Sequence, residues 1–188
     1  MYGMVNKAVE AMVRSNYDEA TWQQIKRHAQ LGDTPFVTMD QYPDDVTYRL
    51  IGAASQVLAM PPDVILQGFG HFWTSYTARE GYRELLFLAG DCFIACLQNL
   101  DNLHARVGLS YPQLRPPSFY CTNITDRSVH LHYISERRGL APMVIGLLYG
   151  LAALFNTTIT IQQIASYEMD ADHDIFAITF DQNGHAGT

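Results

Sequence analysis

The first residue of chemical interest is His104, because the spacing around it places an imidazole among apolar side chains. Four residues recur at steps of four, three and four, the spacing of one face of an α-helix: Phe93, Leu97, Leu100 and His104. A histidine in this position is either a core residue that hydrogen-bonds to backbone or an axial ligand of a haem iron. Pro112, Pro116 and Pro117 follow and predict an extended, non-helical segment close to the ring.

The second candidate site is the set Tyr133, Ser135 and Arg137, which lie two residues apart in an alternating run. Alternation predicts a strand, and a strand places residues two apart on one face of a sheet. A phenol, a hydroxyl and a guanidinium on one face can clamp a carboxylate, since all three donate hydrogen bonds and the guanidinium adds charge. The two propionates of a haem would need such a clamp, although the pattern alone is more often that of a surface arginine beside two satisfied hydroxyls.

The three cysteines, Cys92, Cys96 and Cys121, are too few to form a disulfide framework. Cys92 and Cys96 lie one helical turn apart, which would allow both to bind one metal ion. Because no third ligand is nearby, two buried thiols that pack as small hydrophobic groups are the better interpretation.

The chain has 188 residues, of which 48% are hydrophobic and only 16% charged, enough for one domain with a sizeable core. Its net charge is −7 and its twelve basic residues form no stripe, which argues against nucleic acid and anionic membranes as partners. No apolar run reaches the roughly 18 residues of a membrane span, and the N-terminal segment lacks the apolar block of a signal peptide. We therefore expect a cytoplasmic protein.

Helical spacing dominates the first half of the chain. It predicts helices over residues 2–15, 18–30 and 40–60, another from Pro62 to beyond residue 73, and a short one around 82–89. Asp18 is expected to cap the second of these helices, and Asp91 to cap the helix that carries His104. Gly108 is expected to end that helix.

Strand patterns dominate after Pro117. Alternating or β-branched runs predict strands over residues 129–136, 157–164, 164–169 and 174–180, and a nearly wholly apolar stretch, 139–155, predicts a buried helix. Residues 184–188 are expected to be disordered. The predicted fold class is therefore α+β, with a helical N-terminal lobe over about residues 1–63 and a C-terminal lobe over about residues 64–182, in which a small antiparallel sheet joins further helices.

Together, a helix histidine, a Pro-Pro pair a dozen residues later and a Tyr-x-Ser-x-Arg strand resemble the H-NOX family, the haem nitric oxide/oxygen-binding domains. The resemblance spans essentially the whole chain and rests on these segments: MYG, DDVTYRLIGAAS, NLDNLHARVGLSYPQLRPPSF, LHYISERRGLAPMVIGLLYG and DHDIF. The chain is especially similar to stand-alone cyanobacterial members, and also to the haem domain of soluble guanylate cyclase. The resemblance implies the H-NOX fold, haem b (iron protoporphyrin IX) as cofactor and a C-terminal lobe that cradles the haem.

The resemblance also implies roles for the residues that match the family's motifs. His104 matches the proximal ligand of the iron, and Tyr133, Ser135 and Arg137 match the residues that hold the propionates. Pro117 matches the proline that presses on the porphyrin and bends it. Release of His104 from the iron would let its helix move, and a partner would sense the resulting rotation of the lobes.

On the opposite, distal face of the haem, the side chains decide which gas binds. Met143 is the best match to the tyrosine that donates to O2 in O2-binding members, and a thioether is no donor. Trp73, Val5 and Leu147 are expected to complete an apolar wall. We therefore expect a five-coordinate ferrous haem that binds NO and CO and excludes O2. The alternative is an O2-binding haem protein that uses the indole N–H of Trp73.

Two other classes of protein remain open. A haem enzyme such as a peroxidase or an oxygenase needs a polar distal acid–base group, and the predicted distal wall offers only Trp73 and Met143, with His71 facing elsewhere on its helix. A binding module for a bilin or a lipid would use the clamp for another carboxylate and leave His104 as a core histidine. We expect no enzyme activity, and the resemblance implies signalling in trans to a histidine kinase or a diguanylate cyclase.

Overall fold

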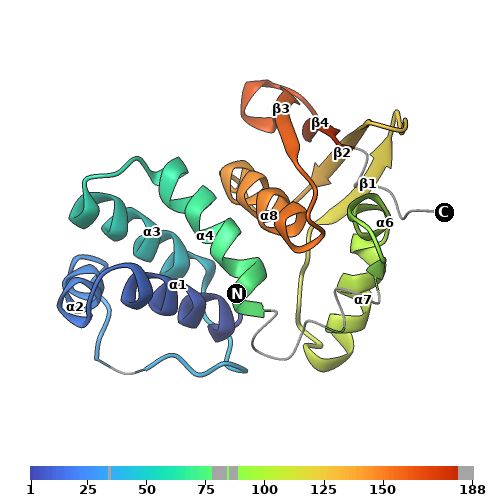
Figure 1. The fold of residues 1–188 in the computed structure, drawn as a ribbon. Coiled ribbons are helices and arrows are strands. Elements are labelled where there is room, and N and C mark those ends of the chain that lie inside the picture. Colours follow the sequence, from blue (N-terminus) through green and yellow to red (C-terminus); the bar gives the residue numbers. More distant parts are fainter. Residues whose placement is uncertain (34, 78–83, 85–88, 182–188) are drawn as a thin grey trace.

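The computed structural model describes residues 1–33, 35–77, 84 and 89–181. The expected helix over residues 82–89 lies outside this part of the chain except for two isolated positions, and the expected disorder at 184–188 lies wholly outside it. Figure 1 shows two groups of elements, a set of helices from the first part of the chain and a sheet with its own helices.

The N-terminal lobe is a bundle of helices that begin and end within a few residues of the predicted positions. Its helices are α1 (Gly3–Asn16), α2 (Glu19–His28) and α3 (Asp44–Leu58), joined by α4 (Pro62–Thr77). α4 packs in the same core although most of it lies beyond residue 63, the predicted end of this lobe. The Asp18 carboxylate accepts a hydrogen bond of 2.7 Å from the Thr21 backbone N–H and so caps α2, as predicted. The apolar faces of the four helices meet in one core, which includes Trp22, Leu50 and Phe69.

The C-terminal lobe packs helices against one face of a four-stranded antiparallel sheet (Figure 1). In spatial order the strands are β1 (Ser118–Thr122), β2 (Ser128–Ile134), β4 (Asp174–Phe180) and β3 (Ile159–Ala165). The described helices of this lobe are α6 (Phe93–Gln98), α7 (Leu100–Ser110) and α8 (Ala141–Leu154). Leu131 and Phe176 of the sheet pack in a second core with Phe93 and Leu97 of α6. The expected fold class is therefore confirmed.

The helix expected around the candidate histidine differs from the prediction at three points. It is interrupted at Asn99, whose side chain hydrogen-bonds to a backbone carbonyl of the preceding turn, so that α6 and α7 are separate helices. Cys92 rather than Asp91 occupies the N-cap position of α6, without a side-chain capping bond. α7 continues past Gly108 and ends just before Pro112, the first residue that lacks the N–H a helix needs.

The strands differ from the prediction at β1 and after β3, and β2 also ends earlier than expected. β1 has only five residues, too few for its alternation to be recognised in the sequence, yet it pairs along its whole length with β2. Residues 164–169 are not a separate strand, because β3 ends at Ala165 after an irregular register and a 3-10 turn, η2 (Tyr167–Met169), follows. The Asp174 carboxylate stabilises this turn by accepting a hydrogen bond of 3.1 Å from the Tyr167 backbone N–H.

The two lobes are joined by a close pair of helices, α4 and α8, which lie side by side in the middle of the molecule (Figure 1). Two glycines allow their backbones to approach. A Cβ atom on Gly70 of α4 would clash with the carbonyl oxygen of Met143, and one on Gly146 of α8 would clash with that of Gln67. Because any larger side chain would push the helices apart, these glycines determine how Trp73 and Met143 are placed across the same space.

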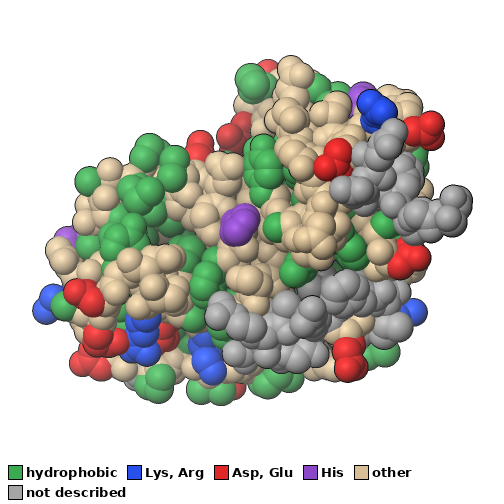
Figure 2. Space-filling view, in the orientation of Figure 1, with side chains coloured by type: hydrophobic (Ala, Val, Ile, Leu, Met, Phe, Trp, Pro, Cys, Tyr) green, Lys and Arg blue, Asp and Glu red, His purple; other side chains and the backbone are tan. Residues whose placement is uncertain are grey.

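The surface carries no concentration of basic residues on the face that Figure 2 shows, where Lys and Arg side chains are scattered among Asp and Glu. In the part of the chain that the structure describes, no helix combines the length and apolarity that a bilayer span requires.

Gly70→Ala is expected to destabilise the protein, because the new methyl group would compete with the Met143 carbonyl for space. Overpacking of this kind costs roughly 1–3 kcal/mol, which urea or thermal unfolding would measure. The matched control is Gly68→Ala in the same helix, where no atom apart from the neighbouring residues and the helix's own backbone lies within 4 Å of the new Cβ. That exchange is expected to stabilise the protein by up to about 1 kcal/mol, as alanine does in helices. Similar effects of the two exchanges would contradict the close contact.

Candidate functional site

A cavity of about 920 Å³ opens between the two lobes. Its walls come from α1, α3, α4, α7 and α8, together with the segments that precede β1 and follow β2. All of the site residues predicted from the sequence line it: Val5, Trp73, His104, Pro117, Tyr133, Ser135, Arg137, Met143 and Leu147. A large, mainly apolar cavity with a few polar groups on its wall is typical of a site for a cofactor or a small molecule.

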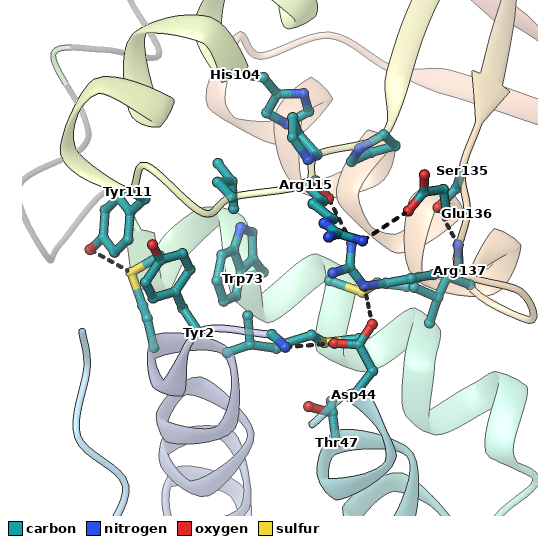
Figure 3. Close-up of a pocket in the computed structure, with 18 of the residues that line it drawn as sticks. Tyr2, Asp44, Thr47, Trp73, His104, Tyr111, Arg115, Ser135, Glu136 and Arg137 are labelled. Carbon is teal, nitrogen blue, oxygen red and sulfur yellow. Dashed lines mark hydrogen bonds and ion pairs between the residues drawn. The ribbon is translucent and has the colours of Figure 1, made fainter. Parts of the chain in front are cut away.

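His104 reaches the cavity from α7 (Figure 3). α7 has no fully buried residue, because the side of the helix that faces inward borders the cavity. The Nδ1 atom of His104 is shielded from solvent and has no hydrogen-bond partner of normal geometry among the described residues. Burial lowers the pKa of the ring, and the nearby Asp101 carboxylate and Pro117 carbonyl only partly offset this. The imidazole is therefore neutral at pH 7, the form that binds a metal ion.

Asp101, one helical turn before His104, ties α7 to the sheet. Its Oδ1 accepts a hydrogen bond of 2.7 Å from the Phe119 backbone N–H, and its Oδ2 accepts one of 2.8 Å from the Ser118 hydroxyl. The Phe119 ring packs against the imidazole of His104, with 5.8 Å between ring centroids. The carboxylate thus fixes the position of His104 relative to Pro117, the residue just before β1.

The clamp residues meet at the end of β2, but not by the strand alternation that the sequence predicts. β2 ends at Ile134, and Ser135 and Arg137 lie in the bend that follows. The bend brings them together, because the Ser135 hydroxyl accepts a hydrogen bond of 3.0 Å from the Arg137 backbone N–H and also bonds to the Tyr133 side chain. Burial raises the pKa of Tyr133, so its phenol keeps the proton that it would donate to a ligand.

Arg137 also connects the two lobes (Figure 3). Its Nε donates a hydrogen bond of 2.7 Å to Oδ2 of Asp44 on α3, and its Nη1 donates one of 2.6 Å to the Arg115 carbonyl. The N-terminal ammonium of Met1 donates to Oδ1 of Asp44 at 2.5 Å. Partial burial raises the pKa of Asp44, but the hydrogen bonds and charges of these two cations outweigh it and hold the pKa below its usual range.

The four residues predicted to form the distal wall line the cavity from α1, α4 and α8: Val5, Trp73, Met143 and Leu147. Of these four, only Trp73 carries an N–H donor, and Figure 3 shows its indole reaching into the cavity from α4. Thr77 lies nearby on the wall, but its hydroxyl donates to the Trp73 carbonyl at 2.8 Å. His71 is exposed and is not among the residues that line the cavity, as expected.

Three residues that hold the site together were not identified from the sequence: Asp44, Asp101 and Phe119. Asp101 is an acidic residue on the exposed side of a helix, and only the position of β1 beside α7 reveals its partners. Asp44 lies 93 residues from Arg137, and in the sequence it is indistinguishable from an acid that favours the start of a helix.

The cysteines do not belong to the cavity. Cys92 and Cys96 are buried, as expected, and neither forms a disulfide bond among the described residues. Burial raises the pKa of Cys96 to about 12, with a smaller contribution from Cys92, and burial raises the pKa of Cys121 to about 11. Thiolates are therefore disfavoured at both positions. Among the described residues, no group of three or more His, Cys, Asp or Glu side chains is arranged to hold a metal ion.

Asp44→Asn is expected to weaken the contact between the lobes, because it removes the charge that pairs with Arg137. The folded-state pKa of Asp44 is below its unfolded value, so the stabilisation is present above about pH 4 and is lost as the pH falls through the folded-state pKa. The wild type should therefore exceed the variant in unfolding free energy by about 1 kcal/mol or less at neutral pH. That difference should disappear in acid, as urea unfolding at several pH values would show.

The control for this experiment is Asp45→Asn, which alters an exposed ion pair with Arg49 on the same turn of α3. It is expected to change the unfolding free energy less than Asp44→Asn does. A difference between Asp44→Asn and the wild type that persists unchanged in strong acid would contradict the role given to the carboxylate.

Comparison with known proteins places this cavity in a family. A family model described as haem-NO-binding matches residues 2–163. Among curated proteins, soluble guanylate cyclase gcy-33 of Caenorhabditis elegans is 34% identical over 155 residues, which cover 82% of this chain and 16% of the cyclase. Soluble guanylate cyclase gcy-31 of the same organism is 28% identical over 182 residues, which cover 96% of this chain and 26% of the cyclase. The chain therefore spans about a quarter or less of the length of these relatives.

Solved structures share the fold. An H-NOX protein from S. oneidensis in the Fe(II)NO ligation state superposes with a TM-score of 0.87 at 23% identity, covering 96% of this chain and 99% of that one. An oxygen-binding H-NOX domain related to soluble guanylate cyclases superposes with a TM-score of 0.79 at 15% identity, covering 100% and 99%. With the family match over most of its length and this fold around the cavity, the chain belongs to the haem-NO-binding (H-NOX) family of haem-based gas sensors.

Proposed function

We propose that this protein senses NO, and also binds CO, at a five-coordinate ferrous haem b whose proximal ligand is His104, and that it excludes O2. The observation that carries the proposal is the set of chemical groups that line one cavity. The cavity has a neutral imidazole on one wall, three donors for carboxylates at its rim, and a distal wall with a single N–H donor among its four predicted residues.

The residues present fit a haem. A cavity of about 920 Å³ with mainly apolar walls suits a flat macrocycle, and His104 supplies one nitrogen ligand from α7. Tyr133, Ser135 and Arg137 supply the donors that two propionates need. When bound, the haem supplies the ferrous iron to which the gas adds. We propose that Pro117, which lines the cavity between α7 and β1, presses on the face of the macrocycle.

Arg137 can donate a hydrogen bond to a haem propionate and keep its hydrogen bond to Asp44. A guanidinium has five N–H donors, and the bonds to Asp44 and to the Arg115 carbonyl use its Nε and Nη1. The second terminal nitrogen remains for a propionate. In this arrangement Arg137 would hold a propionate while it keeps its bond to Asp44 of α3, so Arg137 would connect the ligand with the contact between the lobes.

The distal wall supports the proposed choice of gas. A distal hydrogen-bond donor favours O2, and a charge-assisted hydrogen bond contributes roughly 1.5–3 kcal/mol, or about one to two orders of magnitude in affinity. Met143 occupies the place that matches this donor and has no N–H or O–H group. NO and CO bind ferrous haem without a distal hydrogen bond. An apolar wall therefore lowers the affinity for O2 and leaves the affinity for NO and CO almost unchanged.

His104 is also the proposed link between the gas and the lobes. Asp101 fastens α7 to the start of β1, so a displacement of His104 moves α7 together with the edge of the sheet. We propose that a partner protein, a histidine kinase or a diguanylate cyclase, reads this movement. The curated relatives support a signalling output, since they are guanylate cyclases.

The first test is the visible spectrum of the purified protein after reduction, then with NO, CO and air in turn. The Soret band is expected to shift with NO and with CO and to form no stable complex with O2. His104→Gly should lose the haem spectrum and regain it when imidazole is added, whereas His71→Gly on the exposed face should behave as the wild type. A protein that takes up no haem even on reconstitution, or a His104→Gly variant with an unchanged spectrum, would overturn the proposal.

The second test introduces the missing donor. Met143→Tyr is expected to gain a measurable affinity for O2, raised about tenfold or more by the new hydroxyl, because tyrosine donates where methionine does not. Met143→Phe is the control, since it adds the ring without the hydroxyl. If the wild type itself holds O2, Trp73→Phe shows whether the indole N–H is the donor, and loss of O2 binding in that variant would favour the alternative of an O2-binding protein.

A further inference from the structure

The outer face of the sheet carries a pair of histidines that the cavity does not use. His132 lies on β2, where its side chain points away from the core that its neighbours Leu131 and Tyr133 join. His173 directly precedes β4, the strand beside β2. Nδ1 of His132 lies 2.7 Å from Nε2 of His173. Both side chains are half-buried and remain open to solvent on one side.

Two residues of β1 hold the pair in place. Tyr120 is the register partner of His132, and the two rings stack with 4.2 Å between centroids and 11° between planes. The Tyr120 hydroxyl lies 3.4 Å from Nε2 of His173. The Thr122 hydroxyl lies 2.8 Å from Nε2 of His132. Because Thr122 engages one nitrogen of the ring, the other nitrogen of His132 is the one turned toward His173.

We propose that His132 and His173 form a two-histidine chelate for a divalent copper or nickel ion on the outer face of the sheet. With the Nε2–H of His132 donated to Thr122, the proton between the rings belongs to Nε2 of His173. Transfer of that proton to Nδ1 of the same ring frees one lone pair on each of the two nitrogens, with no net change in charge, and a rotation of the rings turns both lone pairs toward a point beside the line that joins the nitrogens. The ion then takes the place of the hydrogen bond.

The separation of the two nitrogens determines which ions fit. With metal–nitrogen bonds of about 2.05 Å, two nitrogens at a right angle lie about 2.9 Å apart, and two at a tetrahedral angle lie about 3.3 Å apart. The observed 2.7 Å is therefore closer to the right angle. Copper(II) and nickel(II) prefer tetragonal geometry with imidazole ligands, whereas zinc prefers a tetrahedron. Water and the Tyr120 hydroxyl are available for the remaining positions.

The surroundings suit an exchangeable site. Asp174 is next in sequence to His173, but its carboxylate accepts hydrogen bonds from Gln163 and from the Tyr167 backbone. In the described part of the chain, no third His, Cys, Asp or Glu side chain is arranged as a ligand, so solvent and the Tyr120 hydroxyl complete the coordination.

The test is equilibrium dialysis of the whole haem-loaded protein against Cu²⁺ and, separately, Ni²⁺. The wild type is expected to bind one ion per chain, and His132→Ala and His173→Gln are each expected to weaken that binding at least tenfold. His130→Ala is the matched control, since His130 lies on the same strand face but bonds to the Asn123 amide, and it should bind as the wild type does. Thr122→Val should weaken binding about tenfold, because it removes the group that orients the His132 ring.

Electron paramagnetic resonance of the copper-loaded protein gives an independent readout. Coupling to two imidazole nitrogens is expected in the wild type and to one in His173→Gln. His173 takes no part in strand pairing, so this variant carries the test even if His132→Ala fails to fold. Unchanged copper binding in His173→Gln would show that the two rings form only a hydrogen bond between strands. Tighter binding of Zn²⁺ than of Ni²⁺ would overturn the right-angle geometry.

Discussion

The contact between α4 and α8 is the constraint on which the rest of the structure depends. A cavity of about 920 Å³ between two lobes forfeits much of the packing that ordinarily holds a protein together. The lobes must therefore be joined by a closely packed contact outside the cavity. The backbones of α4 and α8 make that contact at Gly70 and Gly146. Each lobe has its own core on its side of this contact, so the cavity is open without either core being incomplete.

Two carboxylates at the rim of the cavity add further contacts that hold the surrounding elements together. Asp101 fastens the His104 helix to the start of β1, and Asp44 holds Arg137 from across the lobe boundary. These two carboxylates are attached to different lobes, and both contact residues on the cavity wall or directly beside it. A ligand that pulls on His104 or on Arg137 therefore acts on the ties between the elements, and not on side chains that move alone.

Sequence patterns predict those parts of this molecule that have a local cause. Helical spacing and the Asp18 cap place the N-terminal helices, and alternation places β4 at its observed ends. The same alternation fails beyond Ile134, because Ser135 and Glu136 are as compatible with a bend as with a strand. Asp44 and Arg137 could not be paired from the sequence, since no pattern in either segment points to a partner 93 residues away. The predicted site residues do line one cavity. They could be predicted because the family resemblance combines segments that lie far apart in the sequence.

The direction of the Trp73 indole N–H follows from the same contact that joins the lobes. The Trp73 ring packs near Phe69 and Tyr76, with centroids 5.8 Å and 6.4 Å away, so its orientation is set by its own helix. That helix is placed by the approach of Gly70 to Met143, one turn earlier. Because Trp73 lies on α4 and Met143 on α8, any shift between these helices moves the indole N–H relative to the Met143 thioether. The proposed selectivity for a gas and the relation of the lobes therefore both depend on one helix contact.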